Sequence, residues 1–128
     1  MTTRMVTSGN AEIAVETFGR PGDPPVLLVM GAMASMLWWP EDFCASLAGR
    51  GRYVIRYDNR DTGLSTTSPL GAPDYTFADM AGDGVAILDT LGIEAAHVVG
   101  LSMGGMIAQR IALVHPGRVS TLTAISTS

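Results

Sequence analysis

The chain has 128 residues, of which 47% are hydrophobic and 16% charged, with a formal net charge of −4. This composition is typical of one folded domain and excludes a disordered chain. All eight basic residues are arginines scattered singly along the chain, so we expect no nucleic-acid partner, which would need a basic patch.

The first half of the chain predicts an antiparallel hairpin followed by buried strands. Residues 5–7 and 11–18 are the expected hairpin strands, with a turn at 8–10 between them. The continuous apolar run 26–30 predicts a strand covered on both faces. A helix is expected at about 40–48 and a further strand at 53–57, before a long polar loop over 58–73.

The second half alternates helices and strands. Apolar residues at helical spacing predict a helix over 76–91, with Thr76 and Asp79 as a capping box and Gly92 at its end. A strand at 97–101, a helix at 103–115 and a strand at 119–126 follow. This alternation predicts a mostly parallel sheet with helices on both faces. The last strand would leave an apolar edge unpaired, so we expect further polypeptide beside it.

The cysteine count, the N-terminus and the longest apolar stretch argue against a disulfide-bonded, secreted or membrane-spanning protein. Cys44 is the only cysteine, so an intrachain disulfide is impossible. Its apolar sequence context predicts a buried, unreactive side chain in the core. The N-terminus lacks the apolar core of a signal peptide, and the apolar stretch 26–39 is too short to span a bilayer. We therefore expect a cytoplasmic protein without a membrane partner.

Residues 100–104, Gly-Leu-Ser-Met-Gly, match the pattern G-x-S-x-G between a predicted strand and a predicted helix. Such a tight reversal forces the serine into a strained backbone conformation, and the residues two positions before and after it must be small. Gly100 and Gly104 meet this demand. Ser102 is thus the predicted nucleophile, and the alternative is a serine that merely caps the helix.

Acyl transfer also needs two backbone N–H groups that point at the developing oxyanion. The residue after the nucleophile, Met103, is expected to supply one, and Ala32, after Gly31 in the loop that follows the strand 26–30, the other. An apolar acyl pocket could be lined by residues just past this loop, although core packing is the commoner fate of such side chains. These residues are Met33, Met36, Trp38 and Trp39.

Segments 29–32, 57–65 and 98–105 resemble the α/β-hydrolase superfamily, in particular its esterase-like group with aclacinomycin methylesterases, non-haem haloperoxidases and enol-lactonases. The resemblance implies an α/β-hydrolase fold, of which residues 1–128 form the N-terminal part of a single core domain, and no cofactor. It also implies that Asp58 and Asp61 order their loop, and that a histidine usual in the family is replaced by Met30. A serine at position 102 argues against haloalkane dehalogenases and epoxide hydrolases, which use aspartate there.

A serine needs an imidazole base within hydrogen-bond reach and a carboxylate to hold that base. His97 should lie roughly 13 Å from Ser102 along its strand, and His115 roughly 18 Å away along its helix, so neither can serve. By resemblance the acid and the histidine come later in the family's sequence, beyond a lid inserted after the strand 119–125. We therefore expect a C-terminal remainder of the same enzyme, as a second chain, to supply them.

The expected function is a serine hydrolase of a small-molecule carboxylic ester or lactone, with an acyl-enzyme on Ser102. Perhydrolysis would use the same triad, so the sequence predicts it equally well. The alternative is a catalytically inactive α/β-hydrolase-fold binding module. A nucleotide-binding Rossmann domain is a weaker alternative, because residues 100–105 are not G-x-G-x-x-G and follow a late strand.

Overall fold

A computed structural model describes residues 3–31, 34–67 and 75–125 of the chain. The described residues form six strands, three α-helices and two short 3-10 turns, and α-helices and strands alternate only after the third strand. The strands are β1 (Thr3–Ser8), β2 (Ala11–Phe18), β3 (Pro25–Val29), β4 (Tyr53–Tyr57), β5 (Ala96–Leu101) and β6 (Val119–Ile125). The helices are α1 (Glu41–Gly49), α2 (Phe77–Thr90) and α3 (Met103–Val114), and the 3-10 turns are η1 (Met36–Trp38) and η2 (Pro116–Arg118).

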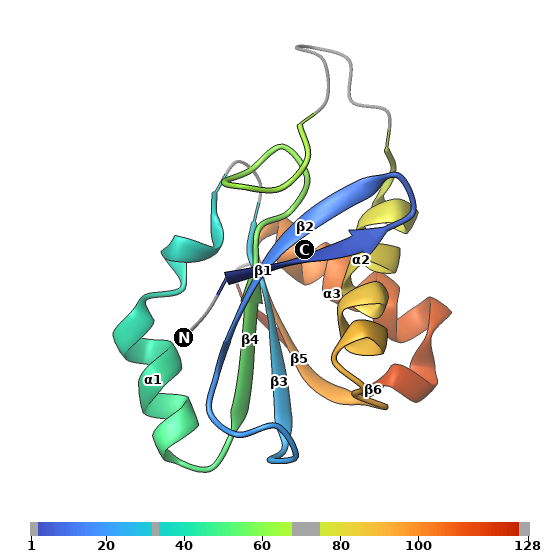
Figure 1. Ribbon diagram of the computed structural model, residues 1–128. Helices are drawn as coiled ribbons and strands as arrows, with labels where there is room; N and C mark the ends of the chain where they lie inside the picture. Colours follow the sequence, from blue (N-terminus) through green and yellow to red (C-terminus); the bar gives the residue numbers. More distant parts are fainter. Residues whose placement is uncertain (1–2, 32–33, 68–74, 126–128) are drawn as a thin grey trace.

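The six strands form one sheet in the order β1-β2-β4-β3-β5-β6 (Figure 1). β1 and β2 pair antiparallel, as do β2 and β4, whereas β4, β3, β5 and β6 run parallel. The expected α/β architecture, a mostly parallel sheet with an antiparallel N-terminal hairpin, is confirmed. The crossovers that parallel strands require are supplied by the helices.

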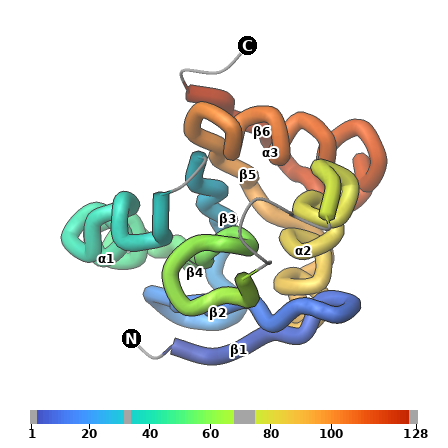
Figure 2. The backbone as a smooth tube through the Cα atoms, turned by 90° about the horizontal axis from the view of Figure 1, so that it is seen from above, coloured from blue at the N-terminus to red at the C-terminus, as the bar shows by residue number. Residues whose placement is uncertain are grey.

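Helices cover the two faces of the sheet unequally. Figure 2 shows α1 on one side of the strands and α2 with α3 on the other. The larger core lies under α2 and α3, where Ile87, Ile107 and Ile111 are fully buried. The smaller core lies under α1 and includes the buried Cys44. The prediction of a buried, structural Cys44 is thereby confirmed.

Local signals in the sequence determine the helix boundaries. The predicted capping box of α2 is present, since Thr76 Oγ1 accepts from the N–H of Asp79 while the Asp79 carboxylate accepts from the N–H of Thr76. Gly92 follows this helix with φ +70°, a conformation that favours glycine. The turns η1 and η2 were not expected, and η2 begins at Pro116, which suits the first position of a helical turn.

β6 is the least covered strand. It pairs with β5 on one side, and residues 120–125 are all exposed. Within the described part of the chain no strand pairs with its other edge. The prediction placed this strand at 119–126, and Ser126 lies outside the described residues.

The parallel arrangement decides where a site can form. The carboxyl ends of β3, β4 and β5 meet at one edge of the sheet, and ligands of open α/β sheets bind at such an edge. The segments that follow these strands therefore lie close together. None of the helices within the described ranges has the length and apolar character needed to cross a bilayer.

Candidate functional site

Ser102 lies at the junction between β5 and α3. Its backbone has φ 57° and ψ −120°, a region that residues with a side chain rarely occupy, and its side chain is exposed. The residue occupies the N-cap position of α3, yet its side chain makes no capping hydrogen bond. The alternative of a serine that only caps the helix is therefore wrong. Strain at an exposed residue is a feature of functional sites.

Two glycines allow this junction to close. A Cβ atom on Gly100 would lie 2.3 Å from the carbonyl oxygen of Gly104, and one on Gly104 would lie 2.1 Å from the carbonyl oxygen of Val29. Both distances are far inside van der Waals contact and involve backbone atoms, which cannot rotate away. The backbones of β3, β5 and α3 thus touch directly, and only glycine fits at these two positions.

The loop after β3 lies against Ser102. A Cβ atom on the buried Gly31 would lie 3.2 Å from Cβ of Ser102 and 3.6 Å from the backbone nitrogen of Met103. Met103 is the first residue of α3, where backbone N–H groups have no partner within the helix. Ala32, the second predicted oxyanion donor, and Met33 lie outside the described residues.

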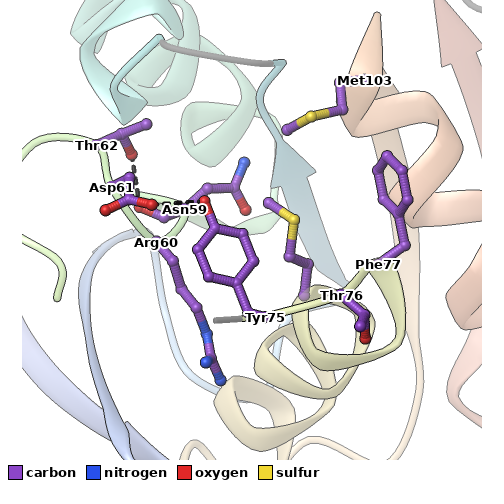
Figure 3. Close-up of a pocket in the computed structure, with 9 residues that line it drawn as sticks. Asn59, Arg60, Asp61, Thr62, Tyr75, Thr76, Phe77 and Met103 are labelled. Carbon is purple, nitrogen blue, oxygen red and sulfur yellow. Dashed lines mark hydrogen bonds between the residues drawn. The ribbon is translucent and has the colours of Figure 1, made fainter. Parts of the chain in front are cut away.

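A pocket of about 310 Å³ opens beside this junction (Figure 3). Met103 lies on one side of it with Phe77, and Arg60, Asp61 and Thr62 lie on the opposite side. Its complete described lining consists of Asn59, Arg60, Asp61, Thr62, Tyr75, Thr76, Phe77, Met80 and Met103. Met103 directly follows Ser102 in the chain, so the pocket borders the residue next to the predicted nucleophile.

The polar side of the pocket is held by hydrogen bonds to the rest of the fold. Tyr75 Oη donates to Asp61 Oδ2 at 2.7 Å, and the Arg60 guanidinium lies 5.7 Å from the centre of the Tyr75 ring. Arg60 donates to both carboxylate oxygens of Asp83 at 2.9 Å. Asp83, only 1% exposed, also accepts from Ser8 Oγ at 2.6 Å. This wall is therefore anchored to α2 and β1.

The predicted role of Asp58 agrees with its contacts. Its Oδ1 accepts from the N–H of Met36 at 2.7 Å and its Oδ2 from the N–H of Leu64 at 2.9 Å. Asp61 adopts φ +64° in the same loop, and its Oδ2 accepts from Tyr75 Oη near the end of that loop. Both carboxylates are thus engaged in ordering the loop after β4, as the resemblance implied.

The two histidines lie away from Ser102. His97 is at the opposite end of β5, where its Nδ1 contacts Thr121 Oγ1. His115 follows the far end of α3. Neither is placed to take a proton from the serine, in agreement with the sequence-based expectation. Within the described ranges no group of three His, Cys, Asp or Glu side chains is arranged to hold a metal ion.

Other titratable groups are unsuited to nucleophilic chemistry. Burial, outweighing the nearby Arg56 charge, raises the pKa of the Cys44 thiol, so the reactive thiolate is disfavoured. Burial, with the charge of Asp83 as the second cause, raises the pKa of Tyr57 well above its ordinary value. The phenol therefore stays neutral.

Of the residues suggested for an acyl pocket past the loop after β3, the described ones divide between core and surface. Met36 and Trp39 are buried, with Trp39 in the core under α1, whereas Trp38 is 72% exposed. None of the three lines the pocket that Met103 lines. Hydrophobicity alone could not separate core from pocket here, because both need the same side chains.

The lining residues from 59–62 and 75–80 were not predicted. Their positions depend on the sheet order, which brings the loop after β4 and the start of α2 beside the junction. The available signal was that loops at the carboxyl ends of parallel strands share one edge.

Comparison with known families is consistent with this geometry. The profile of the family described as alpha/beta hydrolase fold matches residues 24–128. The chain belongs to the α/β-hydrolase fold family. Rhodomycin D methylesterase DauP of Streptomyces sp. (strain C5) is 43% identical over 125 residues, which cover 98% of this chain and 42% of that protein.

Solved structures show the same α/β-hydrolase architecture. A hydrolase from Pseudomonas aeruginosa PA01 superimposes with a TM-score of 0.89 and 32% identity, over 98% of this chain and 46% of that one. Epoxide hydrolase A from Mycobacterium thermoresistibile superimposes with a TM-score of 0.87 and 26% identity, over 96% of this chain and 38% of that one. The chain thus spans less than half the length of these relatives.

Proposed function

We propose that this α/β-hydrolase chain carries the nucleophile of a serine hydrolase that acts on carboxylic esters or lactones. The observation that carries the proposal is the exposed, strained Ser102 with Gly31 packed against it. This arrangement presents a hydroxyl next to backbone N–H groups at the start of a helix, where partial positive charge favours an anion. The similarity to a methylesterase supports an ester substrate.

In the proposed mechanism, Ser102 Oγ attacks the carbonyl carbon and its proton passes to a histidine base. The carbonyl oxygen becomes an oxyanion, which the N–H groups of Met103 and Ala32 would stabilise. Collapse of this intermediate expels the alcohol, which takes the proton from the histidine. Water, activated by the same histidine, then hydrolyses the acyl-enzyme and restores the serine.

The acid and the histidine are proposed to come from polypeptide outside these 128 residues, a C-terminal remainder acting as a second chain. Residues 1–128 would then be the N-terminal part of one core domain. Two observations support this: His97 and His115 lie at the far ends of their elements, and β6 is exposed. The pocket lined by Met103 would hold a group of the ester next to the reacting carbonyl.

Fluorophosphonate labelling tests the proposal, because this reagent modifies only an activated serine. We expect the chain, assembled with the polypeptide that completes it, to be labelled stoichiometrically at Ser102. Ser102→Ala should abolish labelling and ester hydrolysis. Ser46→Ala, at an exposed serine of α1, is the matched control and should change neither.

An inactive binding module is the competing function. A complete lack of labelling in a folded assembly would favour it and would reject the hydrolase.

A further inference from the structure

We propose that Asp58 and Asn59, the two residues that follow β4, hold the two described ends of the segment after β3, called here the β3 loop (residues 30–31 and 34–36), beside Ser102. This inference rests on the proposed function, because it assigns these residues to the oxyanion site of that reaction. Asn59 also lines the pocket, but its Nδ2 is engaged with the Met30 carbonyl and its Oδ1 is buried, so neither residue acts on the substrate through its polar atoms. Both act through the backbone of the β3 loop, so they are positioning residues.

Asn59 holds the first end of the β3 loop. Its Nδ2 donates to the carbonyl oxygen of Met30 at 2.9 Å, and both residues are only 2% exposed. The peptide unit that joins Met30 to Gly31 is planar, so fixing its carbonyl also fixes the direction of the Gly31 N–H. Gly31 is the residue that packs against Ser102 and Met103.

Asp58 holds the other end of the β3 loop. Its Oδ1 accepts from the N–H of Met36, while its Oδ2 accepts from the N–H of Leu64. A Cβ atom on Gly63 would lie 2.1 Å from Asp58 Oδ2, so this side chain is closely packed by its own loop. A carboxylate bound on both oxygens cannot swing, and it transmits the position of the loop after β4 to Met36.

The surroundings of the Asn59 amide indicate that its nitrogen, not its oxygen, accounts for an asparagine at this position. Its Oδ1 is buried and has no hydrogen-bond partner among the described residues. Burying an unpaired acceptor is unfavourable, and such a group in a folded protein calls for an explanation. Leucine would have a similar size without this cost. The donation from Nδ2 to Met30 is the contact that an amide supplies here and leucine does not.

The two contacts together explain why consecutive polar residues follow β4. Oxyanion donors act only when they point at the position that the developing charge will occupy, within a few tenths of an ångström. The described ends of the β3 loop are each tied to the loop after β4, which in turn is tied to β2 by the hydrogen bond from the Ala14 N–H to Ser65 Oγ. The described ends of the β3 loop thus take their position from the sheet.

The test compares Asn59→Leu with Ile87→Val in the assembled hydrolase. Ile87 is a fully buried residue of α2 that does not line the pocket, so its variant controls for a general loss of stability. We expect Asn59→Leu to lower kcat about 10- to 100-fold, less than the loss of an oxyanion donor itself. KM should stay within about two-fold of the wild-type value, because ground-state binding is unaffected. Affinity for a boronic acid transition-state analogue should fall by the same factor as kcat/KM.

Two further variants keep the test decisive should Asn59→Leu not fold. Asn59→Asp places a carboxylate oxygen against the Met30 carbonyl and should lower kcat at least as much as Asn59→Leu. Asp58→Asn keeps one acceptor and loses the other, so its loss should be smaller. Neither should shift the pH profile of kcat, since neither residue exchanges a proton with the substrate.

Amide hydrogen exchange gives a readout that does not need activity. In the 128-residue chain, Asn59→Leu should increase the rate of amide hydrogen exchange at residues 34–36 more than Ile87→Val does.

The outcomes separate this inference from the proposed function. If fluorophosphonate fails to label the wild-type assembly, the proposed hydrolase function is rejected. Amide hydrogen exchange then still tests whether Asn59 and Asp58 hold the β3 loop. If the wild type is labelled but Asn59→Leu matches Ile87→Val in kcat and analogue affinity, the positioning role is rejected. A rise in KM with unchanged kcat would also reject it, because Asn59 would then contact the substrate directly.

Discussion

The Ser102 junction and the Asp83 cluster (Ser8, Arg60, Tyr75 and Asp83) both hold distant segments together, by opposite means. At the junction the backbones of β3, β5 and α3 touch, with no room for a Cβ atom on Gly104. In the cluster a buried carboxylate is satisfied by side chains from two segments, Arg60 and Ser8. Steric contact positions a reacting atom with little freedom, whereas charge pairing joins elements that approach less closely.

This difference has consequences for mutation. A steric contact between backbones cannot relax through a change of rotamer, so any added atom must move whole elements. An ion pair fails in another way, since removing one partner leaves the other charged and buried. The junction should therefore tolerate no larger residue, while the cluster should be sensitive to loss of charge.

The largest effect is expected from Gly104→Ala. Its Cβ would lie 2.1 Å from the Val29 carbonyl oxygen, so the chain should lose more than about 4 kcal/mol of unfolding free energy, beyond ordinary overpacking. Urea denaturation followed by circular dichroism measures this. Gly82→Ala is the matched control, because no atom lies within 4 Å of its Cβ position in the same kind of helix. It should stabilise the protein by roughly 0.5–1 kcal/mol.

A smaller but still large effect is expected from Asp83→Ala. It leaves the largely buried Arg60 without its carboxylate and should cost about 3 kcal/mol in the same denaturation experiment. A loss below about 1 kcal/mol would show that the cluster is dispensable. Charge pairing would then not be what joins β1, α2 and the loop after β4.

The Glu16–Arg56 pair tests the role of charge by pH. Burial raises the pKa of Glu16, but hydrogen bonds from Thr3 and Arg56 and the Arg56 charge outweigh it, so the pKa lies below its ordinary value. A carboxyl with a lowered pKa in the folded state stabilises the protein above its unfolded pKa. This contribution is lost as the pH falls through the folded value. In Glu16→Gln, the free energy of unfolding should vary less with pH below about 5 than in the wild type.

The smallest effect is expected from Asp89→Asn, at the end of α2. Its carboxylate pairs with Arg118 at 2.7 Å but is 62% exposed, so the loss should be only about 0.2–1 kcal/mol. The difference should shrink further in 0.5 M salt. A loss as large as that of Asp83→Ala would contradict the idea that burial decides the strength of these pairs.

Much of the fold followed from local patterns. The apolar runs of β3 and β4 and the capping box of α2 lie where periodicity and capping chemistry predicted them. The turn η1 was not predicted, because three residues are too few to show a periodic pattern of apolar side chains. The edge position of β6 was expected from the chain pattern, and its exposure agrees with that expectation.

The site itself was predicted only in part. Ser102 and its flanking glycines stand next to one another in the sequence, and their spacing reports a backbone bend directly. The pocket side chains come from the loop after β4 and the start of α2, so no short pattern contains them. Trp39 shows the same limit, because an apolar side chain next to the β3 loop can face either a core or a pocket, and only the fold places it in the core.

By itself the sequence determined the succession of strands and helices and the bend at Ser102, because periodicity, capping and the close approach of Gly100 to Gly104 all involve residues near in the chain. Only the tertiary structure decided that Asn59 meets Met30 and that Asp83 meets Arg60 and Ser8. Those contacts depend on the order of strands in the sheet. That order is set by packing the whole core, in which residues far apart in the chain are buried together.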